Sequence, residues 1–145
     1  MTNGAAGIDL EAEDNNRARV PAHAEIGARW SHLAAQARND LSPYIELAYG
    51  ERPRCAYDLF TAPRRGHSTP LVVYIHGGYW QRGDRKDYSF VARELNALGI
   101  DVMVPGYTLC PDVTVGDIVE ELRGCMVAAW QRYGRRPVVV GHSAG

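Results

Sequence analysis

Three short, almost unbroken apolar segments constrain the fold of this chain most strongly: LVVYIH at residues 71–76, IDVMVP at 100–105 and PVVVG at 137–141. None of them alternates apolar with polar residues, as a strand with one solvated face would. Each is of strand length and is too short for a typical buried helix. They predict three strands that are buried on both faces, as in a parallel sheet covered by helices.

Amphipathic helices separate these strands, because apolar residues recur there every three or four positions. The first helix is predicted to begin at Asp84 or Asp87 as the N-cap and to end at Gly99. The second is predicted over residues 114–134, with a capping-box pattern at its start. A further helix is predicted over residues 22–41, ahead of all the strands.

Two short aromatic and β-branched runs, YIELAYG at 44–50 and CAYDLFTAP at 55–63, flank ERPR and predict an antiparallel hairpin. The predicted order from residue 44 is therefore β-β-β-α-β-α-β. This order implies an α/β fold with a doubly wound, mostly parallel sheet and an N-terminal antiparallel hairpin at one edge. We expect residues 1–20 to be a mobile arm and residues 21–145 to belong to one domain.

Charge and cysteine content narrow the class of protein. The chain has 16 basic and 17 acidic residues and a formal net charge of -1, so we expect a small-molecule substrate and neither nucleic acid nor membrane as partner. Without a leader pattern or an apolar stretch of about 20 residues, a cytoplasmic location is expected. Cys55, Cys110 and Cys125 lack C-x-x-C spacing and are interpreted as reduced structural residues.

No phosphate-binding glycine pattern and no ligand-spaced cluster of His, Cys, Asp or Glu occurs in the sequence. We therefore expect no metal and no nucleotide cofactor. The oligomeric state has no signal in the sequence.

The last apolar strand leads into GHSAG at residues 141–145, which matches G-x-S-x-G. A serine on a sharp turn after a strand stands above the carboxyl end of the sheet, where open α/β sheets bind their ligands. In such a turn, side chains at Gly141 and Gly145 would collide with neighbouring backbone. The pattern predicts that Ser143 is a nucleophile, with an ordinary glycine-rich loop as the alternative interpretation.

The first apolar strand ends in IHGGYW at residues 75–80. Backbone N–H groups at this position can hold the oxyanion of a tetrahedral intermediate. We predict donors from Gly78 and from Gly77 or Tyr79, together with Ala144 after the predicted nucleophile. A simple tight turn is the alternative for His-Gly-Gly, but the two motifs occupy corresponding strand ends.

HGGYWQ followed by a helix, then YTLCPDVT and GHSAG, resembles the α/β-hydrolase superfamily, specifically its arylformamidase (kynurenine formamidase) and HGG-type esterase branch. The resemblance covers residues 44–145. It implies that Ser143 becomes acylated or formylated and that the predicted amide donors surround the oxyanion. It also implies that His76 braces the oxyanion loop and moves no protons.

Residues beside these motifs are interpreted as follows. Tyr79 and Trp80 are predicted to line an aromatic substrate pocket, with packing of Trp80 beneath the loop as an equal alternative. Tyr107, Cys110 and Asp112 follow the second apolar strand and are expected to shape the rim of the site without a direct role.

A catalytic serine needs a histidine to accept its proton and a carboxylate to orient that histidine. In α/β hydrolases both follow the serine in the chain. All five histidines here precede Ser143, at positions His23, His32, His67, His76 and His142. His142 is its immediate neighbour and projects away from it on such a turn. We therefore expect this sequence to be the N-terminal part of a longer hydrolase, and the 145-residue chain alone to be inactive and prone to aggregate.

The leading hypothesis is a cofactor-independent serine hydrolase that cleaves a formamide or small ester through a covalent acyl-enzyme, resembling the kynurenine formamidases of tryptophan breakdown. A short-chain carboxylesterase is the first alternative. A non-catalytic, hydrolase-like domain that binds a small molecule or a partner is the second.

Overall fold

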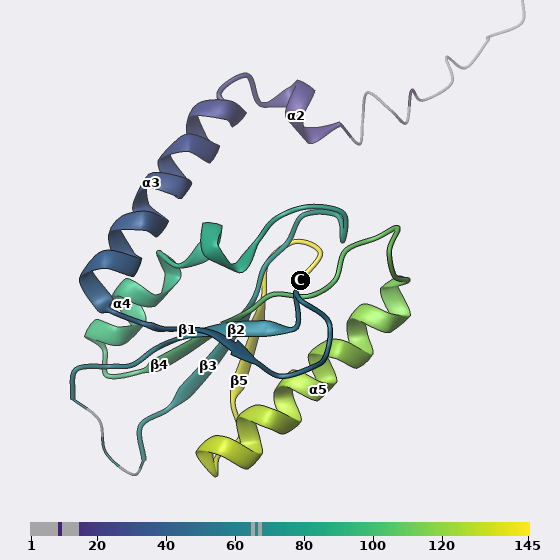
Figure 1. Cartoon of the computed structure of the whole chain (residues 1–145). Helices are drawn as coiled ribbons and strands as arrows, with labels where there is room; N and C mark the ends of the chain where they lie inside the picture. The colour runs from purple at the N-terminus through teal and green to yellow at the C-terminus, as the bar shows by residue number, and fades with distance from the viewer. Residues whose placement is uncertain (1–8, 10–14, 65, 67) are drawn as a thin grey trace, which may run out of the picture.

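A computed structural model describes residue 9, residues 15–64, residue 66 and residues 68–145. The described residues form a five-stranded sheet in the order β1-β2-β4-β3-β5, with helices on both faces (Figure 1). In chain order, the elements are α2 (Asn16–Arg19), α3 (His23–Leu41), β1 (Tyr44–Ala48), β2 (Ala56–Phe60), β3 (Leu71–Ile75), η1 (Arg85–Tyr88), α4 (Val91–Ala97), β4 (Asp101–Pro105), α5 (Val115–Tyr133) and β5 (Val138–Gly141).

The sheet is mixed, rather than mostly parallel as predicted. β3 pairs in parallel with β4 and with β5, whereas β2 pairs antiparallel with both β1 and β4. The difference arises because β2 lies between β1 and β4, so that this strand contributes two antiparallel pairings. β2 is buried along its whole length, as expected for an interior strand of the sheet.

The strands are buried because helices pack on both faces of the sheet. Figure 1 shows α3 and α4 on one side of the sheet and α5 on the other. The core on the α5 side consists of Tyr57, Leu59, Leu71, Val73, Met103, Cys125 and Ala129. The core on the α4 side consists of Phe60, Ala92, Val102 and Val104. This arrangement explains why the apolar runs of β3 and β4 do not alternate with polar residues.

The helix predicted from Asp84 or Asp87 is interrupted in the structure. Asp84 instead caps the 3₁₀ helix η1, because its carboxylate accepts a hydrogen bond from the Lys86 amide at 3.0 Å. α4 begins only at Val91. Between the two elements, Ser89 is fully buried and its hydroxyl donates to the Lys86 carbonyl at 3.1 Å. Such bonding of a serine side chain to backbone competes with a continuous helix.

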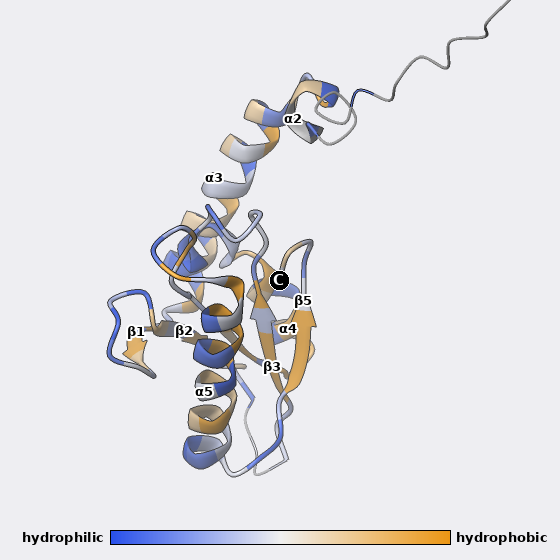
Figure 2. Ribbon diagram, turned by 90° about the vertical axis from the view of Figure 1, so that its right-hand side faces the viewer, coloured by the Kyte–Doolittle hydropathy of each residue, from blue (hydrophilic) through white to orange (hydrophobic). Residues whose placement is uncertain are grey.

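The N-terminal part of the chain stands away from the sheet. Of the arm predicted for residues 1–20, only residues 9 and 15–20 are among the described residues, and α2 forms within them. Figure 2 shows α2 and the first half of α3 projecting from the body, and residues 21–32 are all exposed. Within the described part of the chain, no helix has the length and apolar character needed to cross a membrane.

β5 is apolar but exposed, so the prediction that this strand is buried on both faces is wrong. It forms one edge of the sheet, and β3 is its one neighbour among the described strands. Val138, Val139 and Val140 are all accessible, and Figure 2 shows this strand at the margin of the sheet. An apolar edge strand offers backbone groups for pairing with another chain. This edge gives a physical reason for the self-association expected of the 145-residue chain.

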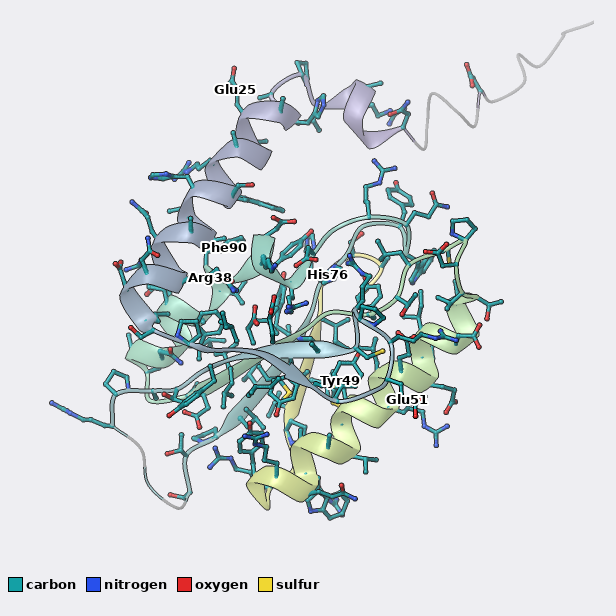
Figure 3. All side chains as sticks on the ribbon, viewed as in Figure 1. Glu25, Arg38, Tyr49, Glu51, His76 and Phe90 are labelled. Carbon is teal, nitrogen blue, oxygen red and sulfur yellow. The ribbon has the colours of Figure 1, made fainter. Side chains whose placement is uncertain are left out.

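A buried carboxylate joins α3 and η1 to the sheet. Asp58 of β2 is fully buried, and its carboxylate pairs with Arg38 of α3 at 2.5 Å and with Arg85 of η1 at 3.2 Å. The same carboxylate accepts a hydrogen bond from the Glu46 amide of β1 at 2.9 Å. Figure 3 shows Arg38 on the side of α3 that faces the sheet. These partners supply the pairing that a buried charge requires.

We expect Asp58→Asn to lower the free energy of unfolding by about 3 to 5 kcal/mol, because Arg38 and Arg85 lose their buried counter-charge. The matched control is Asp40→Asn, which breaks an exposed ion pair with Arg93 and should cost less than about 1 kcal/mol. Urea unfolding followed by circular dichroism measures both losses. Equal losses for the two variants would contradict the anchoring role of Asp58.

Candidate active site

The turns that follow β3 and β5 lie against each other at the carboxyl ends of these parallel strands. The His142 amide donates a hydrogen bond to the Ile75 carbonyl at 3.1 Å. A Cβ added at Gly77 would lie 2.6 Å from the His142 carbonyl oxygen and 2.9 Å from the Ser143 Cβ. A Cβ added at Gly145 would collide with the Ile75 carbonyl. The structure therefore brings the HGG and GHSAG motifs together in one place.

Ser143 lies on a sharp turn. Its φ of 56° is in the left-handed region, which costs a non-glycine residue roughly 1 to 2 kcal/mol. The Gly145 amide closes the turn by donating to the His142 carbonyl at 3.0 Å. Ser143 is exposed. This backbone has the shape expected for a nucleophile turn, and the chemical role of Ser143 stays a prediction.

Residues 77–83, which we call the oxyanion loop, also contain left-handed residues. Gly78 has a φ of 127°, and a side chain there would collide with the Arg82 carbonyl. Tyr79 and Trp80 follow with φ values of 53° and 58°. Two consecutive strained residues without glycine are a feature that the sequence did not reveal. Strain of this kind clusters at functional sites.

The amides of Gly77, Gly78 and Ala144 are candidates for holding an oxyanion. Among the hydrogen bonds of the described residues, none uses these three amides as donors. A backbone N–H without a protein partner can donate to a bound ligand. Their place beside Ser143 supports the predicted oxyanion site, and their use in catalysis stays a prediction.

His76 lies under the oxyanion loop between two tyrosine rings. Its ring is fully buried and stacks on Tyr107 at 4.4 Å and on Tyr88 at 5.3 Å between ring centroids. Figure 3 places His76 close to the ends of the strands, inside the molecule. His76 Nδ1 lies 2.8 Å from the Gly77 carbonyl oxygen, which can only accept, so Nδ1 carries the proton. Burial lowers the pKa of His76, which favours the neutral ring near pH 7. The bracing role that the resemblance implies stays a prediction.

Tyr107 is not at the rim, where it was expected, because it is buried against His76. Its hydroxyl donates to the His76 carbonyl at 2.7 Å. Burial raises the pKa of Tyr107 to about 12, so this hydroxyl stays protonated and remains a donor. Of the other two residues expected at the rim, Asp112 is exposed, and the Cys110 amide donates to the Trp80 carbonyl at 2.8 Å.

Aromatic side chains from three segments border the site. Tyr79 is 48% exposed and Trp80 is 38% exposed, so part of each ring is accessible to a ligand, and both interpretations of Trp80 stay open. From α3, Trp30 approaches His142 at 6.2 Å and Phe90 at 5.7 Å between ring centroids. The sequence predicts only a packing role for Trp30, because no local pattern indicates that α3 extends to the carboxyl ends of the strands.

The described residues show no histidine or carboxylate paired with Ser143. Within that part of the chain, no hydrogen bond joins the Ser143 hydroxyl to a histidine or a carboxylate. His76 is held in its tyrosine stack, the His142 ring packs towards Trp30, and His23 contacts the Val20 carbonyl. His32 is exposed on α3, and His67 lies outside the described residues.

The same region offers no metal centre. Among the residues that the structure describes, no group of three or more His, Cys, Asp or Glu side chains is arranged to hold an ion. What the arrangement can do chemically is present a serine hydroxyl next to amide donors.

Comparison with known proteins agrees with this geometry. No family model matches the sequence. Kynurenine formamidase from Salmo salar is 30% identical over 123 residues, which cover 79% of this chain and 42% of that protein. Kynurenine formamidase from Drosophila melanogaster is 36% identical over 75 residues, or 52% of this chain and 25% of that protein. The chain thus spans less than half the length of these curated relatives.

Solved structures of a proposed thioesterase and of an esterase are also similar to this chain. The crystal structure of a proposed thioesterase from a Silicibacter species superposes with a TM-score of 0.85 at 34% identity, over 96% of this chain and 53% of that chain. Esterase B from Lactobacillus rhamnosis, inhibited by a phosphonate, superposes with a TM-score of 0.62 at 28% identity, over 84% of this chain and 45% of that chain. The chain belongs to the α/β-hydrolase superfamily, in its arylformamidase and esterase branch.

We expect the free energy of unfolding to fall as the pH drops below about 6.5, the ordinary pKa of histidine. Burial lowers the pKa of His76 in the folded state, so below that pH the unfolded chain binds more protons. The stability that the neutral His76 ring contributes is fully present above the pKa that His76 has in the unfolded chain. It is lost as the pH falls through the lower pKa that His76 has in the folded protein. Urea unfolding at several pH values measures the slope.

The variant His76→Asn should reduce this pH dependence, whereas His32→Asn, at an exposed position, should retain it. Because the comparison concerns the slope with pH, a general loss of stability in either variant does not affect it. An unchanged slope in His76→Asn would contradict a buried neutral ring.

Proposed function

We propose that this chain carries the nucleophile and the oxyanion site of a serine hydrolase, which cleaves a formamide or a small ester through a covalent acyl-enzyme. The observation that carries the proposal is the packing of Gly77 against His142 and Ser143. This contact brings amide donors next to a hydroxyl on a left-handed turn. The kinship with proteins named kynurenine formamidase and esterase supports the same chemistry.

In the proposed reaction, Ser143 Oγ forms a bond to the substrate carbonyl carbon, and a histidine takes the hydroxyl proton. The carbonyl oxygen becomes an oxyanion that accepts hydrogen bonds from the Gly78 and Ala144 amides. Collapse of this intermediate breaks the carbon–nitrogen or carbon–oxygen bond, and the leaving amine or alcohol receives the proton. Water then hydrolyses the acyl-serine through the same steps. The proposal needs no cofactor.

The histidine and the acid of this reaction are proposed to come from residues outside these 145. The described histidines are engaged or exposed at other places, as shown above. The chain also spans only 42% of the salmon kynurenine formamidase and 53% of the Silicibacter structure, which leaves ample chain in such proteins for both groups.

The proposed substrate is an aryl formamide. The exposed rings of Tyr79 and Trp80, and the cluster of Trp30 and Phe90 beside His142, offer flat apolar surfaces for an aromatic group. A short-chain carboxylesterase is the second candidate, because esterase structures at 27% to 28% identity share this fold. A non-catalytic domain is the outcome if Ser143 proves unreactive.

In the full-length protein, we expect Ser143→Ala to lower kcat for an aryl formamide such as N-formylkynurenine by at least about 10⁴-fold, because the nucleophile is lost. Ser68→Ala, at an exposed position in a loop, is the matched control and should keep the parental rate. The ratio of kcat/KM for N-formylkynurenine and p-nitrophenyl acetate separates a formamidase from a carboxylesterase.

Full activity in Ser143→Ala would rule out Ser143 as the nucleophile. The 145-residue chain, assayed by itself, should show no Ser143-dependent hydrolysis of p-nitrophenyl acetate. A soluble monomer of this chain that hydrolyses the ester in a Ser143-dependent way would contradict the proposed origin of the acid and the histidine.

A further inference from the structure

Arg54, in the loop between β1 and β2, reaches two segments that are remote from it in the sequence. Its Nε donates to the Tyr107 carbonyl at 2.7 Å, and its Nη2 donates to the Gly83 carbonyl at 2.7 Å. Its Nη1 lies 3.4 Å from a carboxylate oxygen of Asp84. One guanidinium therefore connects the end of the oxyanion loop to the segment that follows β4.

The two carbonyls belong to residues that enclose His76. Gly83 has a φ of 93°, and a Cβ there would lie 3.0 Å from His76 Nδ1 and 2.9 Å from the Gly77 carbonyl oxygen. Tyr107 stacks on the His76 ring and donates its hydroxyl to the His76 carbonyl. By bonding to the carbonyls of Gly83 and Tyr107, Arg54 connects two of the residues that surround His76; the third, Tyr88, stacks on the other face of the ring.

The start of the oxyanion loop depends on the same contacts. Gly77 bonds to His76 Nδ1 through its carbonyl and packs against His142 and Ser143 through its Cα. Because Gly83 lies so close to His76 Nδ1 that a Cβ has no room there, we expect a shift of Gly83 to disturb the bond from Nδ1 to the Gly77 carbonyl. Arg54 is therefore connected to the predicted amide donors through Gly83 and Tyr107, then His76, and then Gly77.

We propose that Arg54 is a positioning residue for the oxyanion site, a role that rests on the function proposed above. Its planar guanidinium presents several donors in fixed directions, which is what two carbonyls and a carboxylate in different segments require. A lysine at this position could satisfy only part of the set, since an ammonium is a single point of charge on a flexible stem.

The chain offers a matched control in the same loop. Arg52 forms an ion pair with Glu121 of α5 at 2.9 Å and touches neither the oxyanion loop nor His76 in any hydrogen bond of the described residues. Arg52→Ala removes the same charge and a similar side chain as Arg54→Ala. The difference between the two variants isolates the contacts to Gly83 and Tyr107.

The test uses Arg54→Ala, Arg54→Lys and Arg52→Ala in the full-length protein. We expect Arg54→Ala to lower kcat by about 10- to 100-fold with little change in KM, because misplaced donors weaken the transition state more than substrate binding. Arg54→Lys should recover part of kcat, and so should millimolar guanidinium added to Arg54→Ala. Arg52→Ala should keep both constants.

Hydrogen exchange of residues 77–83 provides a readout that does not depend on turnover. Arg54→Ala should speed exchange there and leave β3 protected. Unchanged exchange in the loop, or an unchanged kcat in an active protein, would overturn the positioning role. If kcat recovers neither in Arg54→Lys nor in Arg54→Ala with added guanidinium, the loss reflects a general structural defect, which would also overturn the positioning role. A parental protein without Ser143-dependent turnover would instead refute the proposed function, with the exchange result still deciding the role of Arg54.

Discussion

Gly77 and Gly145 each lie against the backbone of the other's turn, so closely that neither position has room for a side chain. The parallel pairing of β3 with β5 makes this contact possible, because it carries both turns to the same edge of the sheet. Burial of β3 and β4 on both faces fixes the position of β3, and backbone pairing joins the exposed strand β5 to it. The left-handed backbone of Ser143 and the amides of the oxyanion loop depend on this contact for their relative placement.

Charged side chains fix the positions of the helices and loops around the site, which apolar packing alone does not determine. Asp58 joins α3 and η1 to the sheet, and Arg54 joins the oxyanion loop to the segment after β4. A buried ion pair contributes little net stability compared with apolar packing, but breaking one leaves an uncompensated charge. The Asp58 cluster therefore restricts the chain to one arrangement, whereas the Arg54–Asp84 pair is partly exposed and Arg54 acts mainly through its two hydrogen bonds to carbonyls. His76, neutral and held between two tyrosines, lies where this arrangement meets the oxyanion loop.

The predictable parts of this structure are those with local signals. Unbroken apolar runs identified β3 and β4, and the two glycine motifs identified the turns around Ser143. The place of β2 between β1 and β4 and the burial of Tyr107 depend on contacts between residues far apart in the chain, which no local pattern encodes. The break at Ser89 comes instead from a local bond of its hydroxyl to the Lys86 carbonyl, which competes with the apolar period that predicted one continuous helix. The role proposed for Arg54 could not be predicted from the sequence either, because its hydrogen-bond partners lie about 30 and 50 residues further along the chain. Trp30 was assigned to packing because its helix has an ordinary apolar period.

The two turns form a serine-hydrolase site only if a tetrahedral centre can occupy the space between them. The most direct measurement is a crystal structure of the full-length protein after reaction with an aryl phosphonate, whose tetrahedral phosphorus imitates the reaction intermediate. We expect phosphorus bonded to Ser143 Oγ and a phosphoryl oxygen within hydrogen-bond distance of the Gly78 and Ala144 amides. An unmodified Ser143, or a phosphoryl oxygen directed away from both amides, would contradict this assignment of the site.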